Sequence, residues 1–344
     1  HHAVGCYTAE SAIKKGNRQS EAALMTAEKI SSLGSAAWGA DYPKDKFTSA
    51  WQRVLFLQFH DSLAGTSVPE HSKTAAEGYG YAMDISNQAT FMSLQKLEWQ
   101  IPAEDPGSQY LLVFNPHAWE SKSIIEYPFA WDVKGKTTRV EDEGGNALPC
   151  QWGTGVTQTR GRHNNLIAQV IIPSMGYRQI RLTEGNSPAT DNPVRAEGNT
   201  IENEYLRVSF SNKGTIGIFD KRTGEEVFAG GQTGCRAVVI NDPSDTWSHD
   251  IRTYSDETGE FGNAKVKILE AGPLRATVRV ISVHGDSRLT VDWSLASGSE
   301  NLEAKVTLDW HEHLKMLKFS FPVNVESPVA TYEVPYGFIE RETN

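Results

Sequence analysis

The sequence changes its periodicity once, near residue 105, and this change limits the chain to a fold with separate helical and strand-rich parts. Residues 8–33 carry apolar side chains at three- and four-residue steps, the spacing of one helix face, and residues 46–63 and 69–100 are also helical in pattern. From Tyr110 onward the apolar residues form short runs rich in β-branched and aromatic side chains, bounded by Pro, Gly and Asn. No strand–helix alternation follows, so we expect an α+β chain with antiparallel sheets.

Local signals predict where the three helices begin and end. Gly34 is expected to stop the first helix and Gly65 the second. Ser67 is expected to cap the third helix, with Pro69 in its first turn and Glu70 closing a capping box. The second helix is apolar around much of its middle, which places it inside a bundle.

We predict three domains. Residues 1–103 would form a three-helix bundle, residues 108–190 a small β-sandwich, and residues 195–344 a larger sandwich. The stretch 185–199 is rich in Gly, Ser, Pro, Asn and Thr, which suggests a linker. The later strands include hairpins whose turns, SNKG and KRTG, supply glycine where a positive φ is needed.

Composition argues against several classes of protein. The chain has 344 residues, a formal net charge of −10 and no apolar run of transmembrane length, so we expect neither nucleic acid nor membrane as a partner. The three cysteines are far apart and form no CxxC pair, which favours reduced thiols and a cytoplasmic protein; they are Cys6, Cys150 and Cys235. With no initiator methionine, signal segment or closing signal, both ends are expected to be cuts through a longer protein. His1 and His2 are either native or a tag remnant.

The segment FLQFHDSLAGTS, residues 56–67, places the ionisable pair His60 and Asp61 at the end of an apolar helix. An imidazole can coordinate a divalent metal, and a carboxylate can accept a hydrogen bond from a substrate hydroxyl. Neighbours on a helix point about 100° apart, so the two side chains would take different roles rather than chelate one ion. The alternative is a helix-end pair satisfied by caps and water, since one ligand does not make a metal site.

Two further clusters carry possible chemistry. Residues 311–313, His-Glu-His, would place both imidazoles on one face of a strand, although a solvated strand end is the simpler interpretation. Residues 241–250 combine Trp247 and His249 with three aspartates in a loop, and an aromatic ring beside carboxylates suits a sugar; the aspartates are Asp242, Asp245 and Asp250. The alternative is an acidic loop with a docked tryptophan. No pattern identifies a pair of catalytic carboxylates.

Several long segments resemble, in order and spacing, the motifs of glycoside hydrolase family 38, the α-mannosidases. They are QFHDSLAGTS, GCYTAESAIKKGNRQSEAALMTAEK, LLVFNPHAWE, IENEYLRVSFSNKGTIGIFDKRTGEEVF, WHEHLKMLKFSFPVNV and YEVPYGFIERET. The resemblance covers nearly the whole chain. It implies a three-helix bundle, a β-sandwich and a C-terminally truncated, galactose-mutarotase-like supersandwich, with the N-terminal catalytic barrel outside this chain.

The resemblance also implies a retaining, metal-dependent α-mannosidase acting on oligosaccharides or small mannosyl conjugates. It assigns His60 to the metal, most simply Zn²⁺, and Asp61, Asp245 and Trp247 to the substrate. The nucleophile, the acid/base and the other metal ligands would lie in the barrel, so we expect no catalytic residue and no activity in this chain, and a homo-oligomer remains open. The loop reads SDTWSHD where many family members are closer to WDAWD. The loop therefore departs from the family motif at the positions from which Asp245 and Trp247 take their assigned roles. The alternatives are a non-catalytic carbohydrate-binding or scaffold module, and a lyase- or mutarotase-type sandwich enzyme.

Overall fold

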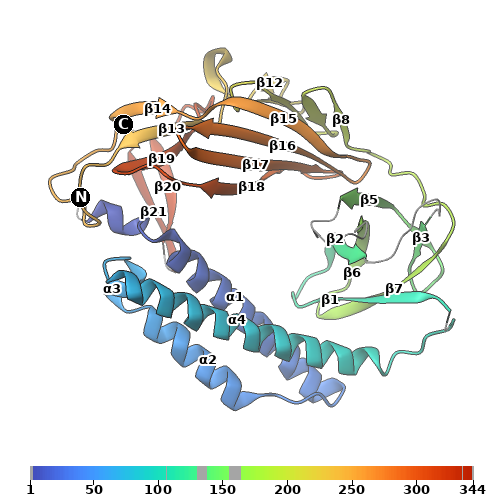
Figure 1. The fold of residues 1–344 in the computed structure, drawn as a ribbon. Helices are drawn as coiled ribbons and strands as arrows, with labels where there is room; N and C mark the ends of the chain where they lie inside the picture. Colours follow the sequence, from blue (N-terminus) through green and yellow to red (C-terminus); the bar gives the residue numbers. More distant parts are fainter. Residues whose placement is uncertain (1–2, 106, 130–137, 155–163, 335, 343–344) are drawn as a thin grey trace. The chain divides into compact units, whose positions relative to one another are not determined.

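The computed structural model describes residues 3–105, 107–129, 138–154, 164–334 and 336–342 (Figure 1). The chain divides into two compact units. Unit 1 consists of residues 1–150, 158–189 and 243–254, and unit 2 consists of residues 151–157, 190–242 and 255–344. The expected mixture of helices and antiparallel sheets is confirmed.

Unit 1 begins with helices that pack on one another. They are the 3₁₀ turn η1 (Val4–Tyr7), α1 (Ser11–Ala37), α2 (Lys44–Leu57), α3 (His60–Leu63) and α4 (Pro69–Glu98). The apolar faces of α1, α2 and α4 form one core in which Leu24, Phe47 and Val54 are buried. Fully burying a side chain of this size contributes roughly 2 kcal/mol. Among the described residues, no helix is both long and apolar enough to cross a membrane.

The predicted helix ends are wrong at three points. Helix α1 continues past Gly34, which is buried at a close packing contact: an added Cβ would lie 2.2 Å from Ser93 Oγ. The second helix breaks into α2 and α3, because Phe59 has extended backbone (φ −51°, ψ 141°). The N-cap of α4 is Val68 rather than Ser67, and no side chain caps it. Pro69 occupies the first turn of α4 as predicted.

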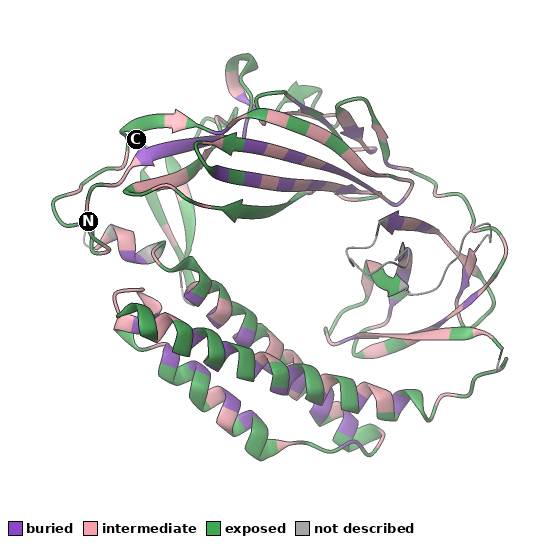
Figure 2. Cartoon of the chain, in the orientation of Figure 1, coloured by how far each residue is buried: buried purple, intermediate pink, exposed green. Residues whose placement is uncertain are grey.

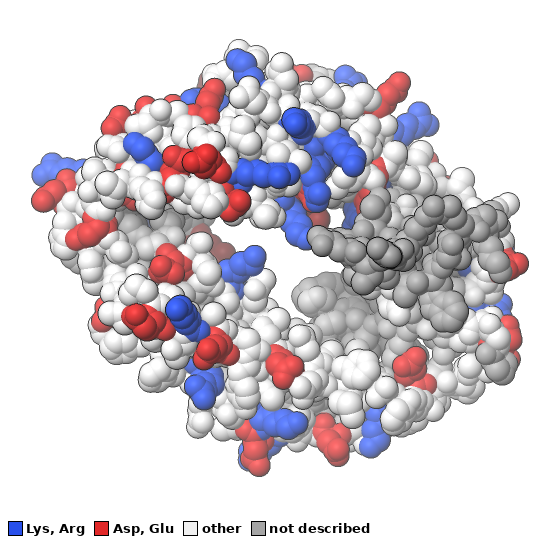
Figure 3. Space-filling view, in the orientation of Figure 1, with Lys and Arg blue, Asp and Glu red and all other residues white. Residues whose placement is uncertain are grey.

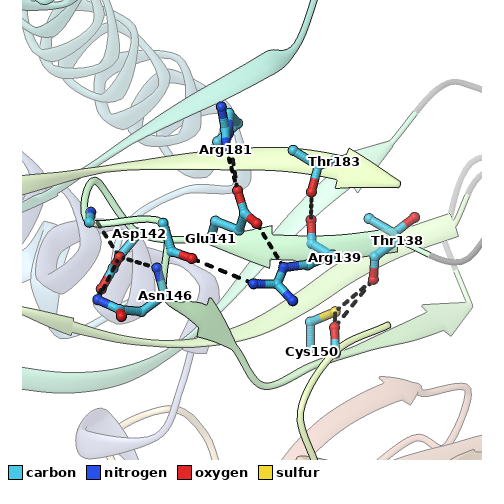
Figure 4. Close-up of polar contacts among 11 residues, drawn as sticks. Thr138, Arg139, Glu141, Asp142, Asn146, Cys150, Arg181 and Thr183 are labelled. Atoms are coloured by element: carbon cyan, nitrogen blue, oxygen red, sulfur yellow. Dashed lines mark hydrogen bonds and ion pairs between the residues drawn. The ribbon is translucent and has the colours of Figure 1, made fainter. Parts of the chain in front are cut away.

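The strands of unit 1 form a small antiparallel sheet in the order β1–β7–β3–β4, and β2 pairs with β6. The strands are β1 (Gln109–Asn115), β2 (Ser121–Phe129), β3 (Thr138–Glu141), β4 (Ala147–Leu148), β6 (Asn164–Ile172) and β7 (Gly176–Glu184), with β5 (Cys150–Thr154) between β4 and β6 in the chain. On β3 and β7, Glu141 is buried between Arg181 (Nη2–Oε2, 2.6 Å) and Arg139 (Nε–Oε1, 2.7 Å), as Figure 4 shows. The hydrogen bond from Arg181 is the main reason that the pKa of Glu141 lies below its ordinary value.

Unit 2 is built of antiparallel strands, which form sheets in the orders β12–β11–β10–β9–β8, β14–β13–β19 and β15–β16–β17–β18, and a hairpin, β20–β21. The strands are β8 (Arg195–Glu197), β9 (Thr200–Glu202), β10 (Leu206–Phe210), β11 (Ile216–Asp220), β12 (Glu225–Glu226), β13 (Arg236–Asn241), β14 (Glu257–Glu260), β15 (Gly262–Ala271), β16 (Arg275–His284), β17 (Ser287–Ala296), β18 (Leu302–Asp309), β19 (Lys315–Ser320), β20 (Val329–Val334) and β21 (Gly337–Glu342), with one 3₁₀ turn, η2 (Ala229–Gly231).

Alternation of buried and exposed side chains builds the core of unit 2, as Figure 2 shows along β16 and β17. Val278 and Leu295 point into this core from neighbouring strands. The predicted turns are confirmed: Gly214 has φ +88° between β10 and β11, and Gly224 has φ +74° between β11 and β12. Only glycine adopts such φ values without strain.

Charges of both signs are interspersed on the face of the molecule in Figure 3, with basic side chains grouped over the β15–β18 sheet. Within this sheet Arg279 of β16 pairs with Asp292 of β17 (Nε–Oδ1, 2.7 Å). Opposite charges paired across neighbouring strands in this way stabilise a sheet modestly. The three cysteines are all free. Burial raises the pKa of the Cys235 thiol to about 12, which makes this thiol unreactive.

Candidate functional site

The break between α2 and α3 presents His60 and Asp61 at the surface of unit 1. The extended Phe59 ends one helix, and α3 starts again at His60. The His60 side chain is 74% exposed, and its Nε2 lies 3.6 Å from Oδ2 of Asp61, which is 44% exposed. The ring of Phe59 lies beside the imidazole, with centroids 4.2 Å apart. The imidazole is therefore accessible rather than sealed among the helix side chains.

Residues 58–66, which we call the HD turn, are held in place at both ends. At the start, Gln58 Nε2 donates to Asn17 Oδ1 (3.0 Å) and to Glu21 Oε1 (2.9 Å) on α1. At the end, the Thr66 hydroxyl donates to Asp61 Oδ1 (2.9 Å), and the Thr66 backbone N–H donates to the Asp61 carbonyl (3.0 Å). Oδ1 of Asp61 thus accepts a hydrogen bond from Thr66, while Oδ2 lies nearest to His60.

The loop of residues 243–254, here called the 243–254 loop, is organised around Asp245. Its Oδ1 accepts hydrogen bonds from the backbone N–H groups of Trp247 (3.0 Å) and His249 (3.3 Å), and its Oδ2 lies 2.7 Å from His249 Nδ1. The side-chain contact with His249 lowers the pKa of Asp245, and the same contact raises the pKa of His249. Trp247 is 39% exposed. The loop thus presents an indole beside an anchored carboxylate.

The other two aspartates of the predicted cluster do not join Asp245 in these contacts. Asp242 lies in the other unit, where its backbone N–H donates to the Leu314 carbonyl (2.8 Å) and its Oδ1 is buried with no hydrogen-bond partner among the described residues. Asp250 stays in the loop with a left-handed backbone (φ +62°). The sequence cluster is therefore divided, and Asp245 with His249 is the pair that the fold brings together.

Residues 311–313 lie in the connection between β18 and β19 rather than on a strand. Nε2 of His311 lies 3.0 Å from Oδ1 of Asp309, and Oε1 of Glu312 accepts a hydrogen bond from Ser287 (3.0 Å). His311 and Glu312 thus each have a polar partner within the chain. The simpler interpretation, a solvated strand end, agrees with this geometry.

A zinc ion at a catalytic site takes about three protein ligands. Across the part of the chain that the structure describes, no group of three or more His, Cys, Asp and Glu side chains is arranged to hold a metal. His60 with Asp61 can supply one portion of a ligand set and no more. The described residues therefore do not make a metal site by themselves, and we derive no chemical step through a metal here.

Comparison with protein families identifies the chain. Residues 2–97 match the alpha mannosidase middle domain, and residues 201–344 match the glycosyl hydrolases family 38 C-terminal domain. These two matches place the chain among the glycoside hydrolases. More particularly, the chain belongs to glycosyl hydrolase family 38, and the HD turn lies inside the segment matched by the middle domain.

Curated relatives agree with this placement. The chain is 27% identical over 354 residues to Alpha-mannosidase 2C1 of Mus musculus and of Homo sapiens, with 99% of this chain and 31% of each relative covered. It is 24% identical over 391 residues to Alpha-mannosidase G of Dictyostelium discoideum, with 99% and 34% covered. The chain thus spans about a third of the length of the curated relatives it matches.

Solved structures show the same fold. A glycosyl hydrolase family 38 protein from Enterococcus faecalis matches with a TM-score of 0.79 and 17% identity, covering 99% of this chain and 48% of that one. An alpha-mannosidase from the same organism matches with a TM-score of 0.78 and 16% identity, covering 99% and 46%.

Sequence reasoning missed the residues that support the candidate site. Ser248 is 5% exposed and accepts hydrogen bonds at Oγ from the Gly5 backbone N–H (2.7 Å) and from Tyr254 Oη (2.6 Å). No local signal could have indicated the contact with Gly5, since 243 residues separate the partners. Thr66 lies in the segment FLQFHDSLAGTS, but its hydrogen bond to Asp61 follows only from the shape of the turn.

Proposed function

We propose that this chain is part of a retaining, metal-dependent α-mannosidase that hydrolyses α-mannosidic bonds in oligosaccharides or small mannosyl conjugates. The observation that carries the proposal is the exposed His60–Asp61 pair within the segment matched by the alpha mannosidase middle domain. Family membership supports the reaction class, and the accessible pair supports a site at this position.

In this proposal each candidate residue has a separate role. His60 is one ligand of a divalent metal, most simply Zn²⁺, because an accessible imidazole nitrogen is a good zinc donor. Asp61 accepts a hydrogen bond from a sugar hydroxyl at Oδ2, since Thr66 already occupies Oδ1. Asp245 and Trp247 contact the substrate from the 243–254 loop, with the indole covering the apolar face of a pyranose. When bound, the metal would orient the vicinal hydroxyls of the mannose.

The remaining parts of the reaction are assigned to the N-terminal barrel domain of the same protein. That domain would supply the nucleophile, the acid/base and the other metal ligands, and this chain by itself would be inactive. We keep the domain division 1–103, 108–190 and 195–344 as a three-helix bundle, a β-sandwich and a C-terminally truncated supersandwich. We also place the protein in the cytoplasm, and the three free cysteines support this.

The decisive experiment is a metal-resolved assay of the full-length parent protein on several α-mannosides. The metal-free protein should be inactive, and one added divalent ion should restore hydrolysis with retained anomeric configuration. An active metal-free protein, or an inverted product, would refute the proposed mechanism.

A second function is favoured by the 243–254 loop alone. Within the loop, Asp245 is held by the Trp247 N–H and by His249, and an exposed Trp247 lies beside it, so the isolated chain could bind a carbohydrate without cleaving it. Calorimetric titration of the chain with methyl α-mannoside, with Trp247→Ala as the control, tests whether the loop binds a carbohydrate. Equal heats from both proteins would rule it out.

A further inference from the structure

Residues 5–10, which we call the N-terminal connector, contact both the HD turn and the 243–254 loop. Toward the loop, the Gly5 backbone N–H donates to Ser248 Oγ (2.7 Å), and the Cys6 thiol donates to the Thr246 carbonyl (3.4 Å). Toward the HD turn, Gly65 packs on the connector at Ala9 and Glu10. All three segments belong to unit 1. One short segment thus joins the two groups of candidate residues.

Two glycines make these contacts close. A Cβ added at Gly5 would lie 2.5 Å from Ser248 Oγ and 2.7 Å from the Thr246 carbonyl oxygen. A Cβ added at Gly65 would lie 2.8 Å from the Glu10 Cβ. Any side chain at either position would push its neighbouring segment away, so the spacing between the segments depends on glycine at both contacts.

Ser248 is the corresponding contact on the loop. It has a left-handed backbone (φ +57°), which is uncommon for a residue with a Cβ. It persists because its hydroxyl is held twice, by the Gly5 N–H and by Tyr254 Oη (2.6 Å). Ser248 lies between Trp247 and His249, so whatever holds its backbone also holds the indole and the imidazole next to it.

We propose that the N-terminal connector is a positioning element that fixes the 243–254 loop relative to the HD turn, with Gly5, Gly65 and Ser248 as positioning residues. The distance between the loop and the HD turn would determine whether a mannoside bound at Asp61 also contacts Trp247, a consequence that rests on the proposed function. The contacts of the N-terminal connector with both segments do not depend on that function. None of the three residues touches substrate; each acts through the residues beside it.

Amide hydrogen–deuterium exchange on the 344-residue chain tests the link. Ser248→Ala removes both hydrogen bonds to Ser248 Oγ and should speed exchange in residues 243–254 and also in residues 5–10 by more than about fivefold, the effect of losing one hydrogen bond. Ser248→Gly relieves the backbone strain but still lacks the hydroxyl, so it should behave like Ser248→Ala. Gly5→Ala should reproduce the effect from the other side of the contact. Gly80→Ala is the matched control, since Gly80 has open space around its Cβ position, and both segments should stay unchanged.

Wild-type exchange of residues 5–10 in Ser248→Gly would overturn the proposal. If Ser248→Ala does not fold, Tyr254→Phe removes one of the two hydrogen bonds to Ser248 Oγ and carries the same test with a smaller change.

Kinetics of the intact enzyme separate this inference from the proposed function. Ser248→Gly should raise KM severalfold for α-mannosides that reach the loop and leave kcat for a small aryl α-mannoside nearly unaltered, because the bond-breaking groups are untouched. A purely structural loss would lower kcat for both substrates and would count against a positioning role. If the wild-type enzyme cleaves no mannoside, the proposed function fails while the exchange result still decides the link.

Discussion

His249 Nδ1 lies 2.7 Å from Asp245 Oδ2, and this pair closes the 243–254 loop on itself. Both side chains are exposed, so the pair is an ordinary surface contact that water and salt weaken. Its interest lies in position, because the pair flanks Trp247 and Ser248. A change in the protonation of His249 or Asp245 would therefore first alter the positions of Trp247 and Ser248.

The first prediction concerns pH. The raised pKa of His249 means that its stabilising contribution is complete below the ordinary value of 6.5 and is lost as the pH rises through the higher value in the folded protein. The lowered pKa of Asp245 means that its contribution is present above the ordinary value of 3.8 and is lost as the pH falls through the lower folded value. The loop should therefore be held best between about pH 4 and 6.5.

NMR titration of the His249 ring measures this directly. Its pKa should lie above 6.5 in the wild-type chain and should fall in Asp245→Asn, because the carboxylate that favours the imidazolium is gone. An identical titration curve in the two proteins would show that the pair does not form in solution.

The second prediction concerns the metal. In the full-length enzyme, His60→Ala should lose bound metal and mannosidase activity together, by a factor of about 100 or more, because one ligand of the set is removed. His311→Ala is the matched control: it is also an exposed histidine with a carboxylate neighbour, and it should keep both properties. Metal content measured by mass spectrometry decides the matter, and full occupancy in His60→Ala would contradict the assignment.

The third prediction is that the chain alone cleaves no aryl α-mannoside. The described residues hold no set of three metal donors, and the proposed function assigns the nucleophile to another domain. Release of the aryl alcohol should equal that of buffer at any concentration of added Zn²⁺. Hydrolytic activity that copurifies with the chain would disprove the assignment of the nucleophile and the other metal ligands to the N-terminal barrel domain.

The fourth prediction tests the helical core. Leu24→Ala should destabilise the helices by about 2–5 kcal/mol, because Leu24 is 0% exposed and its truncation leaves a cavity. Leu55→Ala removes the same atoms from a side chain that is 58% exposed and should cost about 0.5 kcal/mol or less. Urea unfolding followed by circular dichroism at 222 nm compares the two variants. Similar midpoints would mean that the helices pack differently from the structure described here.

The fifth prediction separates strain from crowding at Gly65. Gly65 has φ +75° and Gly39 has φ +68°, so alanine is strained at both, by about 1–2 kcal/mol. Only Gly65 has neighbours that its new methyl would meet, at Glu10 and Ala9. Gly65→Ala should therefore be clearly less stable than Gly39→Ala in the same unfolding assay. Equal losses of unfolding free energy in the two variants would mean that the N-terminal connector does not pack closely against Gly65.

Much of this protein could be predicted from its sequence. The predicted change from helices to strands is confirmed, and so are the predicted turns at Gly214 and Gly224. These features depend on the repeat of apolar residues and on local φ preferences, both of which act over a few residues. The family motifs were also visible, because they are runs of contiguous residues.

The remaining features were decided by tertiary contacts. The apolar run before His60 contains no Pro or Gly that would break a helix, yet the helix breaks at Phe59, next to the point where Gln58 bonds to Asn17 and Glu21 on another helix. Gly34 lies inside helix α1 rather than at its end, and packing explains this glycine, because Ser93 lies too close for a side chain there. The contact between Gly5 and Ser248 joins residues 243 positions apart, a distance over which no local pattern carries information. Sequence therefore determined which elements form and which residues are available for chemistry, and packing between distant segments decided where the helix stops and which loop lies against the N-terminal connector.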